Sequence, residues 1–337
     1  MDEIMQISVV IPTRNRRDSL LRLLHSIQKS EYPLKEVVIV DSSEECITTE
    51  DLSSFKWHVR ILSSAPAVCI QRNIGIEAAQ GEWVLLCDDD VELPADYLKK
   101  LVAHSFCYPT AGAITGSILQ PDLDTRWVDA YPVQSTFDLL YRCIFGLSIW
   151  GPIQVKENIL TRAVIERYKR KGNNLSRAGW PLVTDMDGTF FRTPFFGLGV
   201  CLIKKSWLIN SPYDEVLDPN GYGDNFGVAA GFPEEGIHVL RTTSVYHYRE
   251  HINRPDQASQ FYRRILALHY FIVTKLEQRV SKIAFFWSLI GLLAAFVFKL
   301  RLQMIYACGK LFWIICVVTN PYLKGKRRHQ KAVTPIL

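Results

Sequence analysis

Three consecutive aspartates, Asp88 to Asp90, directly follow the apolar run Trp83–Cys87. A short apolar run predicts a buried parallel strand, and open parallel sheets bind ligands outside the carboxyl ends of their strands. Three carboxylates placed there repel one another unless a cation relieves the repulsion. Asp88 and Asp90 could share a hard divalent ion that also binds a diphosphate. The alternative interpretation is a solvated acidic turn that caps a helix.

Strand and helix patterns alternate around these aspartates. Strands are predicted at 7–11, 37–40, 59–62, 83–87 and 111–119, and helices at 17–29, 70–79 and 96–104. Gly81 is expected to end the second helix. Strands that alternate with helices predict right-handed βαβ units and a parallel sheet.

The pattern dissolves over residues 120–195, which hold many aromatic side chains. Long loops are usually functional or disordered, and the aromatic content predicts a folded lid. Regular patterning resumes over residues 197–204, and a helix near Asp224 and two paired strands around 238–240 and 244–248 are predicted after it.

Two further aspartate pairs follow no apolar strand. Asp122 and Asp124 are interpreted as part of a solvated loop. Asp185 and Asp187 lie beside an aromatic run, and they could line an acceptor pocket.

Charge divides the chain in two. Residues 1–277 hold 29 basic and 34 acidic groups, whereas ten basic and no acidic residues follow Glu277. The uncharged run 283–298 has sixteen residues, fewer than the roughly 20 needed to span a membrane. Lys310 interrupts the next apolar stretch. We expect helices lying in the inner-leaflet interface, with residues 324–331 on anionic headgroups, or alternatively one short span.

The cellular compartment is predicted from the cysteines and the N-terminus. The eight cysteines form no CxxC pair, which indicates a reducing, cytosolic environment and no structural zinc. The acidic start Met1-Asp2-Glu3 predicts no signal peptide. Basic residues gather in the apolar tail, so nucleic-acid binding is not expected. The expected location is the cytoplasmic face of the cell membrane.

An ordered set of short motifs resembles the family 2 glycosyltransferases of the GT-A fold. Its pieces are residues 9–16, 38–42, 72–75, 86–90, 197–205, 213–215, 221–224 and 246–248. The resemblance covers roughly residues 6 to 250 and matches in both order and spacing. It implies an α/β fold with a Rossmann-like, mostly parallel sheet and flanking helices, followed here by C-terminal apolar helices.

The same resemblance implies a domain plan. Residues 1–255 would form the glycosyltransferase domain and 256–337 a helical, basic, membrane-associating tail. Within the domain, 1–119 would bind the nucleotide sugar, 120–195 would form a variable lid or acceptor region, and 196–255 would complete the acceptor and catalytic half.

The activity implied is transfer of a hexose or deoxyhexose from a nucleotide diphosphate sugar to an acceptor. The acceptor is expected to be a glycan or lipid-linked, and the lipid part of this expectation comes from the apolar, basic tail. The anomeric configuration would be inverted, Mn²⁺ or Mg²⁺ would be the cofactor, and the product would be a cell-surface or exported polysaccharide. The implied donor-binding residues are Pro12, Thr13, Arg14, Asp41, Arg72, Asn73, Asp88 and Asp89. The implied metal ligands are Asp88, Asp90 and His247, with His251 as a nearby substitute.

Several of these residues also have simpler interpretations. Asp41 could cap the turn after its strand, and Arg14 or Arg72 could form surface ion pairs of little energetic weight. His247, between two tyrosines in a strand, could be a hydrogen-bonded core residue.

Inverting transfer needs one base that takes the proton of the acceptor hydroxyl. Asp224 is the predicted base, although it could instead cap a helix. The family commonly has Glu-Asp here, whereas this chain has Asp224-Asn225, and an asparagine cannot abstract a proton. Asp214, Glu215 and Asp218 are the reserve candidates.

Two other functions compete with this prediction. A nucleotidyltransferase on a similar sheet would attack the α-phosphate, but such enzymes usually have an N-terminal glycine-rich loop, and residues 12–16 contain no glycine. A non-catalytic sugar-binding or scaffold protein on the membrane is favoured only by Asn225.

Overall fold

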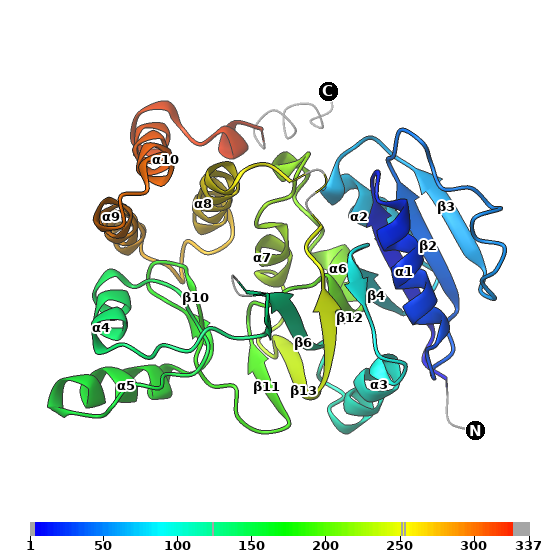
Figure 1. Cartoon of the computed structure of the whole chain (residues 1–337), viewed down its shortest axis with the longest axis horizontal. Helices are drawn as coiled ribbons and strands as arrows, with labels where there is room; N and C mark the ends of the chain where they lie inside the picture. The colour runs from blue at the N-terminus through cyan, green and yellow to red at the C-terminus, as the bar shows by residue number, and fades with distance from the viewer. Residues whose placement is uncertain (1–3, 123–124, 251, 253, 326–337) are drawn as a thin grey trace, which may run out of the picture. The chain divides into compact units, whose positions relative to one another are not determined.

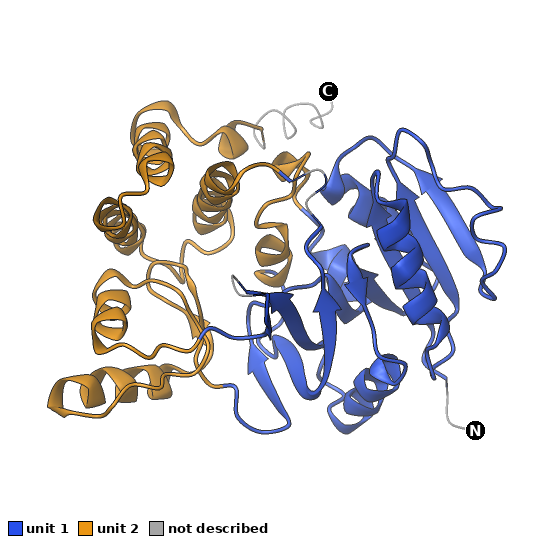
Figure 2. Ribbon diagram, in the orientation of Figure 1, with its two compact units in different colours: residues 1–131, 186–213, 231–254 blue, residues 132–185, 214–230, 255–337 orange. Residues whose placement is uncertain are grey.

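The computed structural model describes residues 4–122, 125–250, 252 and 254–325 (Figure 1). Asp124, His251 and the basic residues after Gly325 therefore lie outside the described residues. The chain forms two compact units (Figure 2). Unit 1 comprises residues 1–131, 186–213 and 231–254, and unit 2 comprises residues 132–185, 214–230 and 255–337.

Unit 1 is built on one large sheet. Its strand order is β11 (Phe190–Thr193), β13 (Ile237–His247), β6 (Ala113–Pro121), β12 (Val200–Lys204), β4 (Trp83–Cys87), β1 (Ile7–Thr13), β2 (Glu36–Asp41) and β3 (Val59–Ser63). The short strand β5 (Val91–Glu92) pairs with β13, and β7 (Trp127–Val128) pairs with β6.

The half of the sheet from β4 to β3 is parallel, as the sequence predicts. Its helices are α1 (Arg17–Gln28), α2 (Val68–Ala78) and α3 (Tyr97–Cys107). Thr13 pairs with Asp41, so β1 and β2 end at the same edge. Helix α2 ends before Gly81, and the expectation that Gly81 is its cap is wrong. Gly81 is needed because an added Cβ would lie 2.6 Å from the Gln6 carbonyl oxygen.

The other half of the sheet is mixed. Strand β12 is antiparallel to both β4 and β6. The two paired strands predicted after residue 237 are instead one strand, β13, which runs parallel to β6 with a register shift between Leu240 and Ser244. A β-bulge of this kind interrupts the alternation of side chains, so the sequence pattern breaks although the strand continues.

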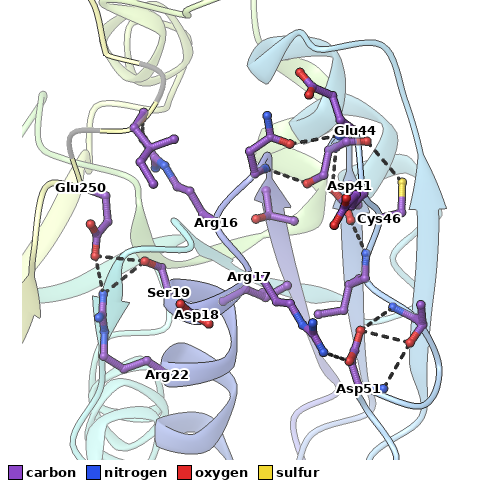
Figure 3. Close-up of a pocket in the computed structure, with 18 residues that line it drawn as sticks. Arg16, Arg17, Asp18, Ser19, Arg22, Asp41, Glu44, Cys46, Asp51 and Glu250 are labelled. Atoms are coloured by element: carbon purple, nitrogen blue, oxygen red, sulfur yellow. Dashed lines mark hydrogen bonds and ion pairs between the residues drawn. The ribbon is translucent and has the colours of Figure 1, made fainter.

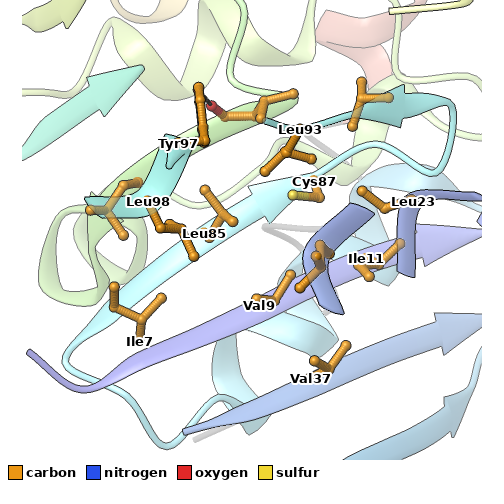
Figure 4. Close-up of a cluster of buried hydrophobic side chains, with 14 of the residues drawn as sticks. Ile7, Val9, Ile11, Leu23, Val37, Leu85, Cys87, Leu93, Tyr97 and Leu98 are labelled. Atoms are coloured by element: carbon orange, nitrogen blue, oxygen red, sulfur yellow. Dashed lines mark hydrogen bonds between the residues drawn. The ribbon is translucent and has the colours of Figure 1, made fainter. Parts of the chain in front are cut away.

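The core of unit 1 lies between its sheet and α1 and α3 (Figure 4). Val9, Ile11 and Leu85 are fully buried, and they come from strands whose apolar runs are almost unbroken. Burying one such side chain contributes about 1.5–3 kcal/mol relative to leaving it exposed. The packed strands therefore hold their carboxyl ends, where the polar residues lie, in fixed positions.

Unit 2 is mainly helical. Its elements are α4 (Thr136–Phe145), α5 (Ile159–Lys171), α7 (Asp224–Ala229), α8 (Gln257–Thr274), α9 (Lys282–Phe298), α10 (Leu302–Trp313), and the small sheet β8 (Ile149–Trp150), β10 (Pro181–Val183) and β9 (Asn174–Leu175). The short helix α6 (Lys205–Asn210) belongs to unit 1. Within 120–195 the described residues are folded, as expected, but they contain helices and strands that the sequence pattern does not reveal.

A second hydrophobic core fills unit 2. Leu139 and Ile149 are fully buried, and Ile165 and Leu182 pack in the same cluster. One segment, Leu302–Gly325, is long and apolar enough to cross a membrane by length and composition alone, and 22% of its most apolar window is buried. The apolar helix α9 is shorter than a span.

Candidate active site

Asp88, Asp90 and His247 come together in unit 1. Asp88 directly follows β4, and His247 is the last residue of β13. The antiparallel pairing of β13 with β5 sets His247 opposite Val91, beside Asp90. One ligand atom from each of the three residues lies within 4.8 Å of the others. The predicted carboxylates and the predicted histidine are thus neighbours in space, although about 160 residues separate them in the chain.

Two atoms of this cluster have the spacing and the free lone pairs of neighbouring metal ligands. The Asp90 Oδ1 and His247 Nε2 atoms are 3.2 Å apart. Both are buried, and neither has a hydrogen-bond partner among the described residues. Neighbouring ligands of an octahedral ion with bonds of about 2.1 Å lie about 3 Å apart. Carboxylate oxygen and imidazole nitrogen are suitable donors for Mn²⁺, so the residues present fit a divalent cation.

The other oxygen of Asp90 is fixed by the chain after β13. Asp90 Oδ2 accepts hydrogen bonds from the Glu250 backbone N–H at 3.0 Å and from the Arg254 guanidinium at 2.9 Å. Burial raises the pKa of Asp90, but His247 and the cations Arg254 and Arg16 outweigh it and hold that pKa well below its usual value. Asp90 is therefore an ionised carboxylate in a fixed orientation.

Asp88 is held from two sides. Its Oδ1 pairs with the Arg72 guanidinium at 2.7 Å, and its backbone N–H donates to the Gly199 carbonyl at 2.7 Å. A Cβ added at Gly199 would lie 2.2 Å from Asp88 Oδ2. Only glycine at the start of β12 leaves room for this carboxylate.

Asp89 is buried between β1 and α1. Its carboxylate accepts hydrogen bonds from Thr13 Oγ1 and from the Arg16 guanidinium, both at 2.9 Å. Burial raises the pKa of Asp89 to about 6, although Arg16 opposes the rise. Asp89 thus ties the aspartate loop to the end of β1, and its predicted contact with the donor stays a prediction.

A pocket of about 870 Å³ opens at the carboxyl ends of β1 and β2 (Figure 3). Its wall includes Thr13, Arg16 and Asp41, and its volume lies in the range of small-molecule sites. The Asp41 carboxylate accepts from the backbone N–H groups of Ser43 and Ile47, each at 2.8 Å. Asp41 therefore orders the turn after β2, which is its simpler interpretation, and it also faces the pocket.

The other predicted donor-binding residues have structural partners. Arg72 is 7% exposed and its guanidinium lies over the Tyr213 ring at 5.1 Å. The Asn73 side chain exchanges two hydrogen bonds of 3.0 Å with the Tyr213 backbone. Pro12 is buried within β1, and Arg14 is half-buried beyond its end. Their donor contacts stay predictions.

Asp224 belongs to unit 2. It is the first residue of α7, is 7% exposed, and accepts a hydrogen bond of 2.6 Å from the Asn225 backbone N–H. Gly223 is the N-cap, so Asp224 does not cap the helix. Among the reserves, Asp214 pairs with Lys275 at 2.7 Å and accepts from Tyr270 at 2.9 Å, and Glu215 is exposed.

Sequence reasoning missed three residues that hold the site. Arg16 and Arg254 carry the positive charge around Asp89 and Asp90. The Gln71 amide donates to the carbonyls of Thr13 and Val40, both at 2.8 Å, and so joins the ends of β1 and β2. The one available signal was position, because Arg16 follows β1 and Gln71 precedes the Arg72-Asn73 motif.

Comparison with protein families gives one match. Residues 8–168 match the family model described as "Glycosyl transferase family 2". Among curated proteins, TuaG of Bacillus subtilis (strain 168), named as a teichuronic acid biosynthesis glycosyltransferase, is 29% identical over 115 residues, which are 33% of this chain and 46% of TuaG. The matched region is thus less than half the length of this relative.

Solved structures are similar over most of the chain. The structure of TarS residues 1–349 from S. aureus gives a TM-score of 0.54 at 17% identity, covering 92% of this chain and 80% of that fragment. Its complex with UDP-GlcNAc gives a TM-score of 0.51 at 17% identity, over 92% and 81% of the two chains. GalNAc-T7 with UDP, GalNAc and Mn²⁺ gives 0.54 at 15% identity, over 83% of this chain and 52% of GalNAc-T7.

At these identities the structural likeness shows the fold alone. The predicted α/β architecture is confirmed, with an antiparallel strand inside the sheet. Residues 8–168, just under half of the chain, match glycosyltransferase family 2, and the fold is that of the GT-A glycosyltransferases.

Proposed function

We propose that this protein transfers a sugar from a nucleotide diphosphate sugar to a glycan or lipid-linked acceptor, with inversion and with a divalent metal ion. The observation that carries the proposal is the buried pair of Asp90 Oδ1 and His247 Nε2, which lack hydrogen-bond partners among the described residues and lie beside Asp88.

Each residue of unit 1 has a distinct part in donor binding. Asp88, Asp90 and His247 would hold Mn²⁺ or Mg²⁺, which when bound supplies positive charge for the departing diphosphate. The pocket next to Thr13 and Asp41 would take the nucleoside. Arg16 and Arg72 keep the aspartates oriented through the ion pairs described above.

Asp224 is our candidate for the base. Among the described residues of unit 2 it is the only buried acidic or basic side chain. A carboxylate removed from water at a helix start is typical of a functional group rather than a surface charge. It would take the proton from the acceptor hydroxyl as the oxygen attacks the anomeric carbon opposite the diphosphate.

Substrate and location are also part of the proposal. Solved relatives of the same fold contain UDP, GalNAc or UDP-GlcNAc, so UDP-sugars are the first donors to test. TuaG supports an acceptor in cell-wall or exported polysaccharide synthesis. The apolar helices after residue 256 and the basic excess after Glu277 support association with the anionic cytoplasmic face of the membrane.

A thermal-shift screen of sugar nucleotides, with and without Mn²⁺, tests donor and metal together. The correct donor should raise the melting temperature only when Mn²⁺ is present, because a ligand that binds the native state stabilises it by mass action. A shift of the same size in EDTA would overturn the metal role of Asp88, Asp90 and His247. In an assay of donor turnover, release of sugar 1-phosphate instead of a nucleoside diphosphate would show attack at the α-phosphate and would therefore indicate a nucleotidyltransferase.

A further inference from the structure

We infer that the exposed apolar face of α9, together with the cations at its two ends, is a docking surface for an anionic lipid bilayer. This inference rests on the membrane association proposed above and names the surface responsible. All the residues involved belong to unit 2.

Helix α9 is apolar on both of its faces, but only one face is covered. Phe285 and Leu289 are buried. On the opposite face Ile283 is 84% exposed, Ile290 is 45% exposed and Phe298 is 80% exposed. The exposed residues recur at helical spacing, so they form one stripe along the helix. Exposed apolar surface of this extent is typical of a site that binds a membrane or another protein.

The buried face fixes α9 in the folded unit. The Trp180 indole N–H donates to Ser288 Oγ at 2.8 Å, and Tyr141 donates to the Gly291 carbonyl at 2.5 Å. A Cβ added at Gly291 would lie 2.4 Å from the Phe145 ring, so α4 and α9 touch closely. If α9 crossed a bilayer, these hydrogen bonds to its neighbours would be placed in hydrocarbon. We therefore expect α9 to lie parallel to the membrane surface, with only its exposed face in contact with lipid.

Both ends of the stripe carry unpaired positive charge. Arg177 and Arg279 flank Ile283 in a pocket at the start of α9, and the Arg177 carbonyl accepts from the Ser281 backbone N–H at 2.9 Å. Lys299 and Arg301 follow its end. None of these four cations makes an ion pair among the described residues. Because no acidic residue follows Glu277, the surface is complementary to anionic headgroups.

An apolar chamber adds to the same face. It has a volume of about 570 Å³ and lies between α4 and α9, with Phe137, Leu292, Phe296 and Lys299 in its wall. Hydrocarbon that enters this chamber would extend the contact made by the stripe, and Lys299 would meet a headgroup at its mouth.

Co-sedimentation with vesicles of phosphatidylcholine alone, and of phosphatidylcholine with 30% phosphatidylglycerol, tests the inference on the full chain. Wild type should bind the anionic vesicles and lose binding as salt is raised. The double variant Ile283→Glu/Phe298→Glu should bind at least about tenfold more weakly, because it puts charge into the apolar stripe. Arg177→Glu/Arg279→Glu should also bind at least about tenfold more weakly, because it replaces two cations near the anionic headgroups.

Helix α5 provides matched controls, since Ile159 is 97% and Leu160 is 60% exposed there. Ile159→Glu/Leu160→Glu and Lys169→Glu/Arg170→Glu make the same changes of charge. Circular dichroism is used to check that each variant folds. Equal losses in the α5 and α9 variants would overturn the assignment to α9. If wild type bound no vesicles but formed a dimer that the α9 substitutions disrupted, the stripe would be a contact between two copies of the chain and the docking surface would be refuted.

Donor turnover in solution is measured on the same proteins. A chain that binds vesicles through α9 but turns over no sugar nucleotide would refute the transfer reaction and leave the docking surface standing. A chain that turns over donor but binds neither kind of vesicle would refute the docking surface alone.

Discussion

Each of the two units has a hydrophobic core, but unit 1 also buries charged side chains, whereas unit 2 leaves large apolar side chains exposed. Unit 1 encloses charged groups, such as Arg72, Asp89 and Asp90, at the ends of fully apolar strands. Unit 2 leaves large apolar groups, such as Ile159 and Ile283, exposed on its helices. Buried charge is costly unless it is paired, and exposed hydrocarbon is costly unless something covers it. The difference supports the proposed donor site in unit 1 and the proposed docking surface in unit 2.

Asp90→Asn should produce the largest effect. It removes the charge that faces His247, Arg254 and Arg16, and we expect donor turnover to fall by at least about 100-fold because metal affinity is lost. Because Arg254 loses its ion pair while Arg16 keeps the one with Asp89, unit 1 should also be destabilised, by about 3–5 kcal/mol at most. Turnover and urea denaturation measure the two effects separately.

Asp122→Asn is the control for this change, because Asp122 begins another aspartate pair and its partner Arg126 is largely exposed. It should leave turnover within about twofold of wild type, as expected for a surface pair. Equal losses in the two variants would show that buried charge in unit 1 has no special role.

Gly199→Ala should have the next largest effect. The new methyl group collides with Asp88 and displaces it, at a cost of about 1–3 kcal/mol. We expect the Mn²⁺ concentration needed for half-maximal turnover to rise. Gly309→Ala in α10 is the matched control, because a Cβ there meets nothing within 4 Å. Alanine suits a helix better than glycine, so this variant should fold as well as wild type or better.

Acid should destabilise unit 1 through His104. Its Nε2 lies 2.8 Å from His238 Nδ1, and burial with the nearby His238 lowers the pKa of His104 from 6.5 to about 4. The unfolded chain then binds the proton first, so stability is complete above pH 6.5 and falls as the pH drops toward 4.

Urea midpoints measured between pH 7 and pH 4 test this expectation. His104→Gln should flatten the curve, whereas the exposed His25 changed to Gln should not. Part of the slope that remains should come from His238, whose pKa burial lowers, and from His269 in unit 2, whose pKa burial lowers to about 4. An unchanged slope in His104→Gln would contradict the assignment.

Ser288→Ala should have the smallest effect. It leaves the buried Trp180 indole N–H without its partner and should lower the free energy of unfolding by about 1–2 kcal/mol. Donor binding measured by calorimetry should not change, because the substitution lies in unit 2. Weaker donor binding would show that a change in unit 2 affects the donor site of unit 1, and would contradict the separation of functions proposed above.

Much of unit 1 could be predicted from the sequence. Apolar runs define β1, β2 and β4 closely, and the polar residues that follow each run mark the edge where the site lies. The position of His247 came from the family resemblance, since no local pattern relates it to Asp90. Arg16 and Arg254 were missed because an ion pair between residues far apart in the chain has no characteristic spacing.

Less of unit 2 could be predicted, for physical reasons. Helix α5 buries only Thr161, Ile165 and Tyr168, so its apolar periodicity is weak, whereas α4 is clearly amphipathic and its pattern was missed. The three-stranded sheet is built from strands of two or three residues, which are too short to show alternation. Asp224 was identified from the family motif at residues 221–224, and the adjacent sequence gave no indication that its side chain is buried.

The antiparallel insertion of β12 has a consequence for how the protein is made. Strand β4 pairs on one side with β1, but its other edge stays open until residues 200–204 leave the ribosome, more than 100 residues later. An apolar strand with a bare edge readily joins other chains. Nascent chains should therefore be most prone to aggregation, and most dependent on chaperones, during that interval of translation.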